Sequence, residues 1–147
     1  MSTTVAIPFA LTHQVRDTCL CLHVQRAARA LARRFDEALR PVGLTSGQFS
    51  LLMSLNRPMP ATISSVSTLL AMDRTTLTAN LKPLERRGLV KVTVDPDDRR
   101  SRQLTLTAKG RSLLAEAVPI WKRTHAAVEQ LLSRNADELR ADLNALS

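Results

Sequence analysis

The chain has 147 residues, which is enough for one domain with a substantial hydrophobic core. Its 21 Lys and Arg outnumber its 13 Asp and Glu, and the resulting net charge of +8 favours a polyanionic partner such as nucleic acid. No apolar run approaches the roughly 18 residues of a membrane span, and two cysteines are too few for a disulfide framework. We therefore expect a cytoplasmic protein with no membrane partner. The mildly apolar N-terminus is expected to be a short arm or an extra helical turn and not a signal peptide.

Two helices are expected in the first third of the chain. Apolar residues recur at helical spacing over residues 17–39, and Pro41 and Gly43 end this helix. A second helix begins at Thr45, where Gln48 stands three residues on, as a capping box requires.

The middle of the chain has the order of a helix-turn-helix followed by a β-hairpin. A short helix begins at Thr62, and a further helix begins at Asp73, a good N-cap, and ends before Gly88. Residues 89–94 and 102–106 then alternate with period two, which predicts two strands joined by a charged turn.

Two helices complete the chain. Thr107 caps a long helix that we expect to reach Ser133 and to be kinked at Pro119. Asn135, with Glu138 three residues on, caps the last helix. The long helices before and after the hairpin unit all carry apolar stripes, and a small winged domain cannot cover three of them, so they need one another or a partner.

The expected fold is therefore mainly α with a small β-wing, as one domain over residues 1–147. A winged helix-turn-helix over residues 45–107 is flanked by dimerisation helices over residues 12–42 and 108–147. In such a homodimer the two recognition helices enter major grooves about one turn of DNA, ~34 Å, apart.

The helix that begins at Asp73 has two contrasting faces. Leu77, Leu81 and Leu84 form its buried side, and the opposite face mixes small, hydroxyl and basic residues that can approach a major groove closely. The alternative is an ordinary solvated face. The candidate DNA-binding residues of this helix and of the short helix before it are Ser64, Arg74, Thr75, Thr76, Thr78, Ala79, Lys82 and Arg86.

The tip of the hairpin also carries DNA-binding candidates, because a narrow minor groove attracts an inserted Arg. One interpretation is that Asp98 orients an Arg toward the groove, and the other is a solvated, salt-bridged turn. The basic candidates are Arg99, Arg100 and Arg102, and the acidic residues beside them are Asp95, Asp97 and Asp98.

The stretch from residue 77 to residue 110 resembles the MarR family of bacterial regulators. The resemblance rests on LERRGLV at residues 84–90, DPDDRR at 95–100 and LTLTAKG at 104–110. It implies an obligate homodimer that reads a palindrome, with Asp98 and Arg100 as the wing Asp and the minor-groove Arg. It also places Thr75, Thr76, Thr78 and Lys82 at recognition-helix positions.

Two residues depart from the family pattern. Ala71 stands where the family usually has Gly before the recognition helix. Pro83 lies inside that helix, where it removes one backbone hydrogen bond and is expected to bend or loosen the helix end. We therefore expect this proline to affect the reach of Arg86.

The family resemblance also raises the question of regulation. Many members lose DNA affinity when a small molecule binds, and here we expect an apolar or phenolic effector. Cys21 matches the reactive cysteine of the peroxide-sensing branch, but Gln25 and Phe35 replace its supporting tyrosines. An inert, half-buried Cys21 and a sensor thiol both remain open. Cys19 and Cys21 would point about 160° apart on one helix and could not easily pair. Trp121 either lines a ligand cleft or belongs to the core.

Enzyme classes find little support in the sequence. Only four glycines occur, and no phosphate-binding loop, Ser/His/Asp spacing or thioredoxin-like Cys motif is present. His13, His23 and His125 lack metal-ligand spacing. We expect a DNA-binding regulator, a repressor without catalytic activity, metal or cofactor. The alternatives are a thiol-based oxidative-stress regulator of the same fold and a nonspecific basic architectural protein.

Overall fold

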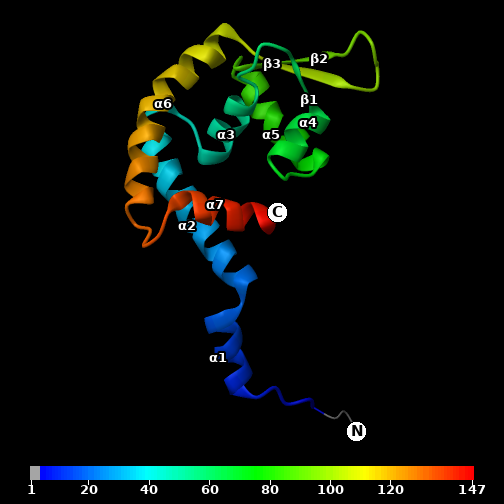
Figure 1. Ribbon diagram of the computed structural model, residues 1–147. Helices are drawn as coiled ribbons and strands as arrows, with labels where there is room; N and C mark the ends of the chain where they lie inside the picture. Colours follow the sequence, from blue (N-terminus) through cyan, green and yellow to red (C-terminus); the bar gives the residue numbers. More distant parts are fainter. Residues whose placement is uncertain (1–3) are drawn as a thin grey trace.

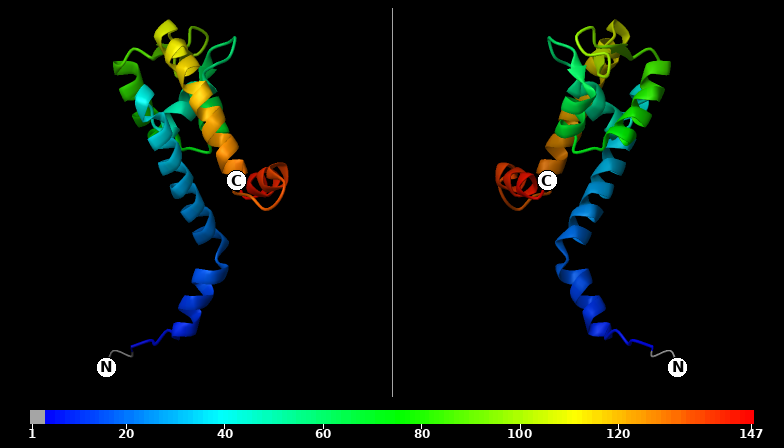
Figure 2. Two further views of the ribbon diagram at one scale, coloured as in Figure 1. Left: turned by 90° about the vertical axis from the view of Figure 1, so that its left-hand side faces the viewer. Right: turned by 90° about the vertical axis from the view of Figure 1, so that its right-hand side faces the viewer.

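The computed structural model describes residues 4–147 and confirms a mainly helical fold with a small antiparallel sheet (Figure 1). The winged part lies at one end, and α2 and α1 project from it as a long stalk (Figure 2). The elements in chain order are α1 (Phe9–Thr18), α2 (Leu20–Leu39), the 3-10 helix η1 (Arg40–Val42), α3 (Ser46–Ser54), β1 (Ala61–Thr62), α4 (Ile63–Leu69), α5 (Arg74–Arg86), β2 (Val90–Val94), β3 (Arg102–Leu106), α6 (Ala108–Glu129) and α7 (Ala136–Ala145).

Side-chain caps start the helices of the winged part where the sequence predicts. Thr45 Oγ1 accepts a hydrogen bond from the Gln48 N–H, and Gln48 Oε1 accepts one from the Thr45 N–H, so the capping box is confirmed. Thr62 begins α4 in the same way with Ser65. These bonds satisfy backbone donors that the first helical turn would otherwise leave unpaired.

The sheet has the strand order β1-β3-β2 and is antiparallel throughout. The expected hairpin is present, with Val90 opposite Leu106 and Val94 opposite Arg102. β1, which was not predicted, pairs Ala61 with Leu104. The core packs α3, α4 and α5 against this sheet and against the start of α6.

The N-terminal part differs from the expectation of a short arm and a helix that starts at residue 17. Residues Phe9–Thr18 form a ten-residue helix. Cys19 has an extended backbone (φ −68°, ψ 111°) and separates this helix from α2. Its N–H donates to Val15 O at 3.0 Å and its carbonyl accepts from His23 N at 3.1 Å, so one residue ends α1 and starts α2. The 160° estimate for Cys19 and Cys21 therefore does not apply, because Cys19 lies outside a helix.

The C-terminal helices also differ in detail from the prediction. α6 continues through Pro119 but ends at Glu129 and not at Ser133, because Leu131 and Leu132 donate to carbonyls only three residues back. Asn135 caps α7 as expected, although its side chain accepts from Asp137 N, at 2.7 Å.

The turn between α4 and α5 holds its chain in a left-handed conformation. Ala71 has φ +51°, the one non-glycine residue with positive φ among residues 4–147. A side chain in this region costs about 1–2 kcal/mol, which explains the glycine expected at this position.

We predict that Ala71→Gly stabilises the protein by about 0.5–1 kcal/mol, because the relief of strain exceeds the added entropy of the unfolded chain. Urea denaturation at one protein concentration measures this difference. Ala30→Gly is the matched control, since Ala30 is exposed inside α2 and glycine there should destabilise by about 1 kcal/mol. Destabilisation by both substitutions would contradict strain at Ala71.

Candidate nucleic-acid interface

α5 presents the expected two faces. Leu77, Leu81 and Leu84 are buried in the core, which fixes the opposite side outward. Each candidate on this helix is exposed: Arg74, Thr75, Thr76, Thr78, Ala79, Lys82 and Arg86.

The start of α5 is fixed by Asp73. Its carboxylate accepts from the Thr76 N–H and from the Thr76 hydroxyl, both at 2.8 Å. These bonds lower the pKa of Asp73 below its ordinary value, so the carboxylate stays charged at the positive end of the helix.

The three threonines of this face are not equivalent. The Thr76 hydroxyl donates to Asp73, and the Thr78 hydroxyl donates to the Arg74 carbonyl at 2.8 Å. Phosphate oxygens only accept hydrogen bonds, so these two residues offer a lone pair or a methyl group to DNA. Within residues 4–147 the Thr75 side chain makes no hydrogen bond, which leaves its hydroxyl available to donate.

Ser64 of α4 and Arg74 of α5 lie together. Arg74 Nη2 donates to Ser64 Oγ at 3.2 Å, and both side chains are exposed. The serine hydroxyl proton and the other guanidinium N–H groups can then meet one phosphate from two helices. Both residues were predicted as DNA-binding candidates from the sequence, but their contact was not predicted.

Pro83 does not end the recognition helix. α5 runs on to Arg86, and the Arg87 N–H still donates to the Pro83 carbonyl at 3.1 Å. The expected loosening is therefore absent from the hydrogen bonding after this proline, and Arg86 keeps its exposed place.

The wing is shaped by backbone contacts of its acidic residues. Asp98 Oδ1 accepts from Arg100 N at 3.0 Å, and Asp95 Oδ1 accepts from Asp97 N at 2.9 Å. No ion pair joins a carboxylate and a guanidinium of the wing in the described part of the chain. Asp98 thus contacts the backbone of Arg100 and not its side chain, and the salt bridges of the alternative interpretation are not seen among the described residues.

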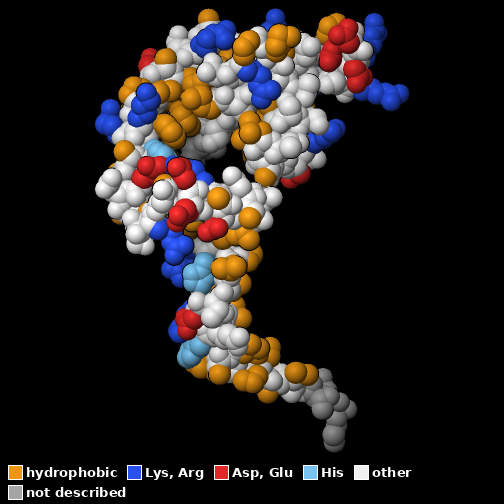
Figure 3. Space-filling model, in the orientation of Figure 1, with side chains coloured by type: hydrophobic (Ala, Val, Ile, Leu, Met, Phe, Trp, Pro, Cys, Tyr) orange, Lys and Arg blue, Asp and Glu red, His pale blue; other side chains and the backbone are white. Residues whose placement is uncertain are grey.

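The arginines of the wing have different surroundings. Arg102 donates to the Arg99 carbonyl at 3.2 Å and so folds back on the turn. Arg99 and Arg100 are exposed at the tip, where basic and acidic side chains project beyond the sheet (Figure 3). The tip can therefore present free guanidinium groups to a groove.

A hollow of about 370 Å³ lies between α3, α4 and α6. The ring of Trp121 stacks on Phe49 with centroids 6.1 Å apart, so this residue both joins the edge of the core and lines the hollow. The lining residues are Phe49, Ser50, Met53, Ser54, Leu69 and Trp121.

The two cysteines lie where α1 meets α2, part-way along the stalk. Cys19 is half-buried at the N-cap of α2, where Leu22 N approaches its sulfur at 3.5 Å. Cys21 is exposed and not half-buried, and Gln25 Nε2 lies 3.4 Å from its sulfur.

Over residues 4–147, no helix combines the length and hydropathy that a bilayer crossing requires.

Comparison with known proteins gives this geometry a context. Residues 44–101 match the model of the MarR family. The transcriptional activatory protein BadR of Rhodopseudomonas palustris is 37% identical over 95 residues, which cover 63% of this chain and 54% of BadR. The matched part of the chain thus spans only about half the length of curated relatives such as BadR.

Solved structures match over a larger share of the chain. The M. tuberculosis transcriptional regulator MosR in complex with DNA is 40% identical, with a TM-score of 0.81 over 88% of this chain and 93% of that chain. The transcriptional repressor CouR bound to a 23-mer DNA duplex is 32% identical, with a TM-score of 0.79 over 97% of this chain and 99% of that chain. These relatives are regulators, which agrees with the expectation that the chain is not an enzyme. The chain belongs to the MarR family of transcriptional regulators.

Proposed function

We propose that the protein binds a palindromic DNA site as a homodimer and represses transcription. The observation that carries this proposal is the exposed face of α5, set beside a wing whose tip presents Arg99 and Arg100. MosR and CouR were solved with DNA, and CouR is a repressor, which supports DNA binding and repression. BadR is an activator, so activation is the alternative outcome. A DNA target of this kind would be reached in the cytoplasm, which is the location that we propose.

The homodimer is proposed from the apolar stalk. Leu20 is 68% exposed and Leu146 is 62% exposed, and within the bounds of α1 and α7 no residue is buried. Apolar side chains continue along the stalk (Figure 3). Such a surface is large for a monomer, and a second copy that packs α1, α2 and α7 against their counterparts would cover it. α1 begins at Phe9, so we extend the dimerisation segment beyond the expected residue 12.

We assign the effector to the hollow that Trp121 and Phe49 line. Its lining, all within the described residues, is apolar, aromatic or hydroxyl-bearing and carries no charge, which suits an apolar or phenolic group. CouR has also been solved with p-coumaroyl-CoA. Four of the six lining residues belong to α3 and one to α4, so we expect an effector there to move helices that pack beside α5 in the core.

The DNA proposal is tested by selecting duplexes from a randomised pool and measuring affinity against salt for the selected palindrome and a scrambled duplex. We expect the palindrome to bind about 10³-fold or more tightly at physiological salt, with both affinities falling as salt rises. Equal affinities at each salt concentration would identify a nonspecific basic protein. Sedimentation of the free protein tests the dimer separately.

A thiol-based regulator is the second candidate, favoured by the exposed thiol of Cys21. Cys21 is exposed to oxidants, and Cys19 lies close by at the N-terminus of the 20-residue helix α2, with Leu22 N 3.5 Å from its sulfur. We expect Cys21→Ser and wild type to keep their operator under mild peroxide. Release of wild type alone would establish the sensor.

A further inference from the structure

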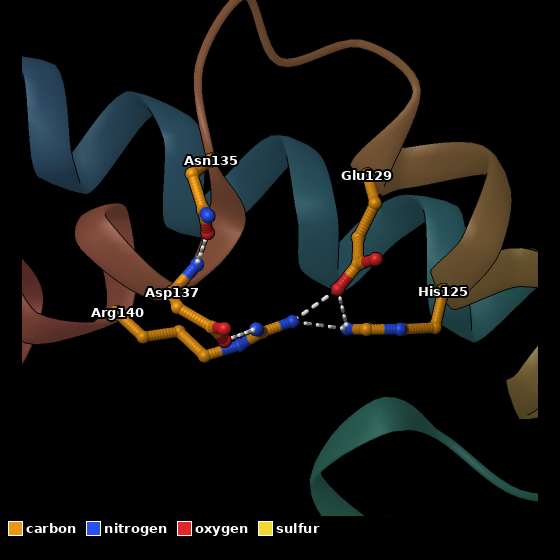
Figure 4. Close-up of polar contacts among 5 residues, drawn as sticks. All are labelled: His125, Glu129, Asn135, Asp137 and Arg140. Carbon is orange, nitrogen blue, oxygen red and sulfur yellow. Dashed lines mark hydrogen bonds and ion pairs between the residues drawn. The ribbon is translucent and has the colours of Figure 1, made fainter.

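Four charged or titratable side chains meet where α6 turns into α7 (Figure 4). Arg140 of α7 forms ion pairs with Asp137 at 2.7 Å and with Glu129 at the end of α6. Its Nη2 also lies 3.4 Å from Nε2 of His125, and that same Nε2 lies 3.5 Å from Glu129 Oε1. Arg140 is thus the link between the two helices at this corner.

This link matters because α7 has little else to hold it. Within Ala136–Ala145 no side chain is buried, so apolar packing in the single chain does not fix the helix. The contacts of Arg140 with Glu129 and His125 are the side-chain hydrogen bonds that cross from α7 to α6 in the described residues. Exposed interactions of this kind are individually weak, so a change at one of them can shift the equilibrium between attached and detached α7.

The atom Nε2 of His125 has two neighbours with opposite demands. Arg140 can only donate, so the 3.4 Å contact requires an unprotonated Nε2 that accepts. Glu129 can only accept, so the 3.5 Å approach becomes a hydrogen bond when Nε2 carries a proton. Protonation of the ring therefore turns the contact with Arg140 from attraction to repulsion and makes the imidazolium compete for Glu129.

The contact that protonation weakens and the ion pair that it strengthens involve different helices. His125 and Glu129 both belong to α6, so their ion pair adds nothing to the attachment of α7. The contact that weakens is the one that crosses to α7. Histidine is in general the side chain whose charge changes between about pH 5 and pH 8, so this is the pH range in which to test the exchange.

The ring face of the imidazole is linked to the winged part through two stacked aromatic rings. His125 stacks on Trp121 with centroids 4.8 Å apart and planes 17° apart, and Trp121 stacks in turn on Phe49 of α3. Three rings thus form a column from the α6–α7 corner to the hollow beside the helix-turn-helix. A change at His125 lies one ring away from that hollow.

We propose that His125 is a proton-dependent latch, which holds α7 on α6 through Arg140 when neutral and releases it when protonated. The charged groups that face the imidazole are Glu129 on its own helix and Arg140, with Asp137 behind it, on α7. From α2, Arg34 and Glu37 line a separate groove with Arg123 and Thr124 of α6. Because α7 belongs to the proposed dimer surface, acid would weaken the dimer; this last step alone rests on the proposed function.

The experiment uses the full chain and two probes. Trp121 is the sole tryptophan, so its emission reports the state of the stacked ring without labelling. Hydrogen exchange over Ala136–Ala145, expressed as protection relative to the unfolded peptide at each pH, reports the attachment of α7. Between pH 8 and pH 5.5 we expect Trp121 emission to change in one step and α7 protection to fall by up to about fivefold.

Variants separate the latch from general acid effects. His125→Gln keeps a hydrogen-bond acceptor without the charge change and should remove both transitions, whereas His23→Gln, on α2, should leave them unchanged. Arg140→Gln should give low α7 protection at both pH values. Equal α7 protection in wild type at pH 8 and pH 5.5, or an undiminished transition in His125→Gln, would overturn the proposal. Neither outcome depends on DNA binding, so the regulator function stands or falls separately.

Discussion

Arg100→Ala is expected to weaken binding to the palindromic duplex by about 1–3 kcal/mol, roughly five- to 150-fold, and to leave the dimer intact. The guanidinium is exposed at the tip of the wing, where the Arg100 N–H is held by Asp98 at 3.0 Å. Its side chain has no ion-pair partner among residues 4–147, so it can enter a narrow minor groove without breaking an internal contact. Titration of a labelled duplex at fixed salt measures the loss.

The matched control is Arg26→Ala, which removes the same charge from the exposed surface of α2, away from the wing. Its small effect on affinity gives the contribution of net charge alone. If both variants lost affinity equally, or if Arg100→Ala lost none, the tip would be only a solvated turn. Sedimentation of each variant checks that the dimer is retained.

Local chemistry made much of the winged part predictable. Thr45, Asp73 and Thr107 begin their helices because an oxygen on each side chain accepts a backbone N–H three residues on. The leucines of α5 recur at helical spacing, so its inward and outward faces followed from the sequence as well. Short-range rules sufficed wherever the partner lay within one turn.

The misplaced elements depend on distant or weakly coded partners. β1 has two residues, too few for a visible alternation, and it exists through its pairing with β3 about 40 residues later. Cys19 separates α1 from α2, and no Gly or Pro at this position indicates the break in the sequence. The occupied hydroxyls of Thr76 and Thr78 could not be seen either, because a sequence shows which groups can donate but not which have already done so.

The second large effect is expected from Gly110→Ala, at the junction of the wing and α6. A Cβ built at Gly110 would lie 2.1 Å from the backbone carbonyl oxygen of Leu89, far inside van der Waals contact. The obstacle is backbone, and the Leu89 carbonyl already accepts from Thr107 N at 3.1 Å, so it cannot swing aside without losing that bond. We expect destabilisation by about 3 kcal/mol or more, the upper end of overpacking effects.

Thermal unfolding at one protein concentration measures this change, and a fall in Tm of roughly 6–12 °C corresponds to it for a chain of this length. Gly47→Ala is the control, because a Cβ there meets nothing within 4 Å and Gly47 lies inside α3. It should stabilise the protein by about 0.5–1 kcal/mol, since alanine is the better helix former. Wild-type stability in Gly110→Ala would mean that α6 can withdraw from Leu89 at little cost. The wing and the dimerisation helix would then be coupled far more loosely than the 3.1 Å bond between Thr107 and Leu89 implies.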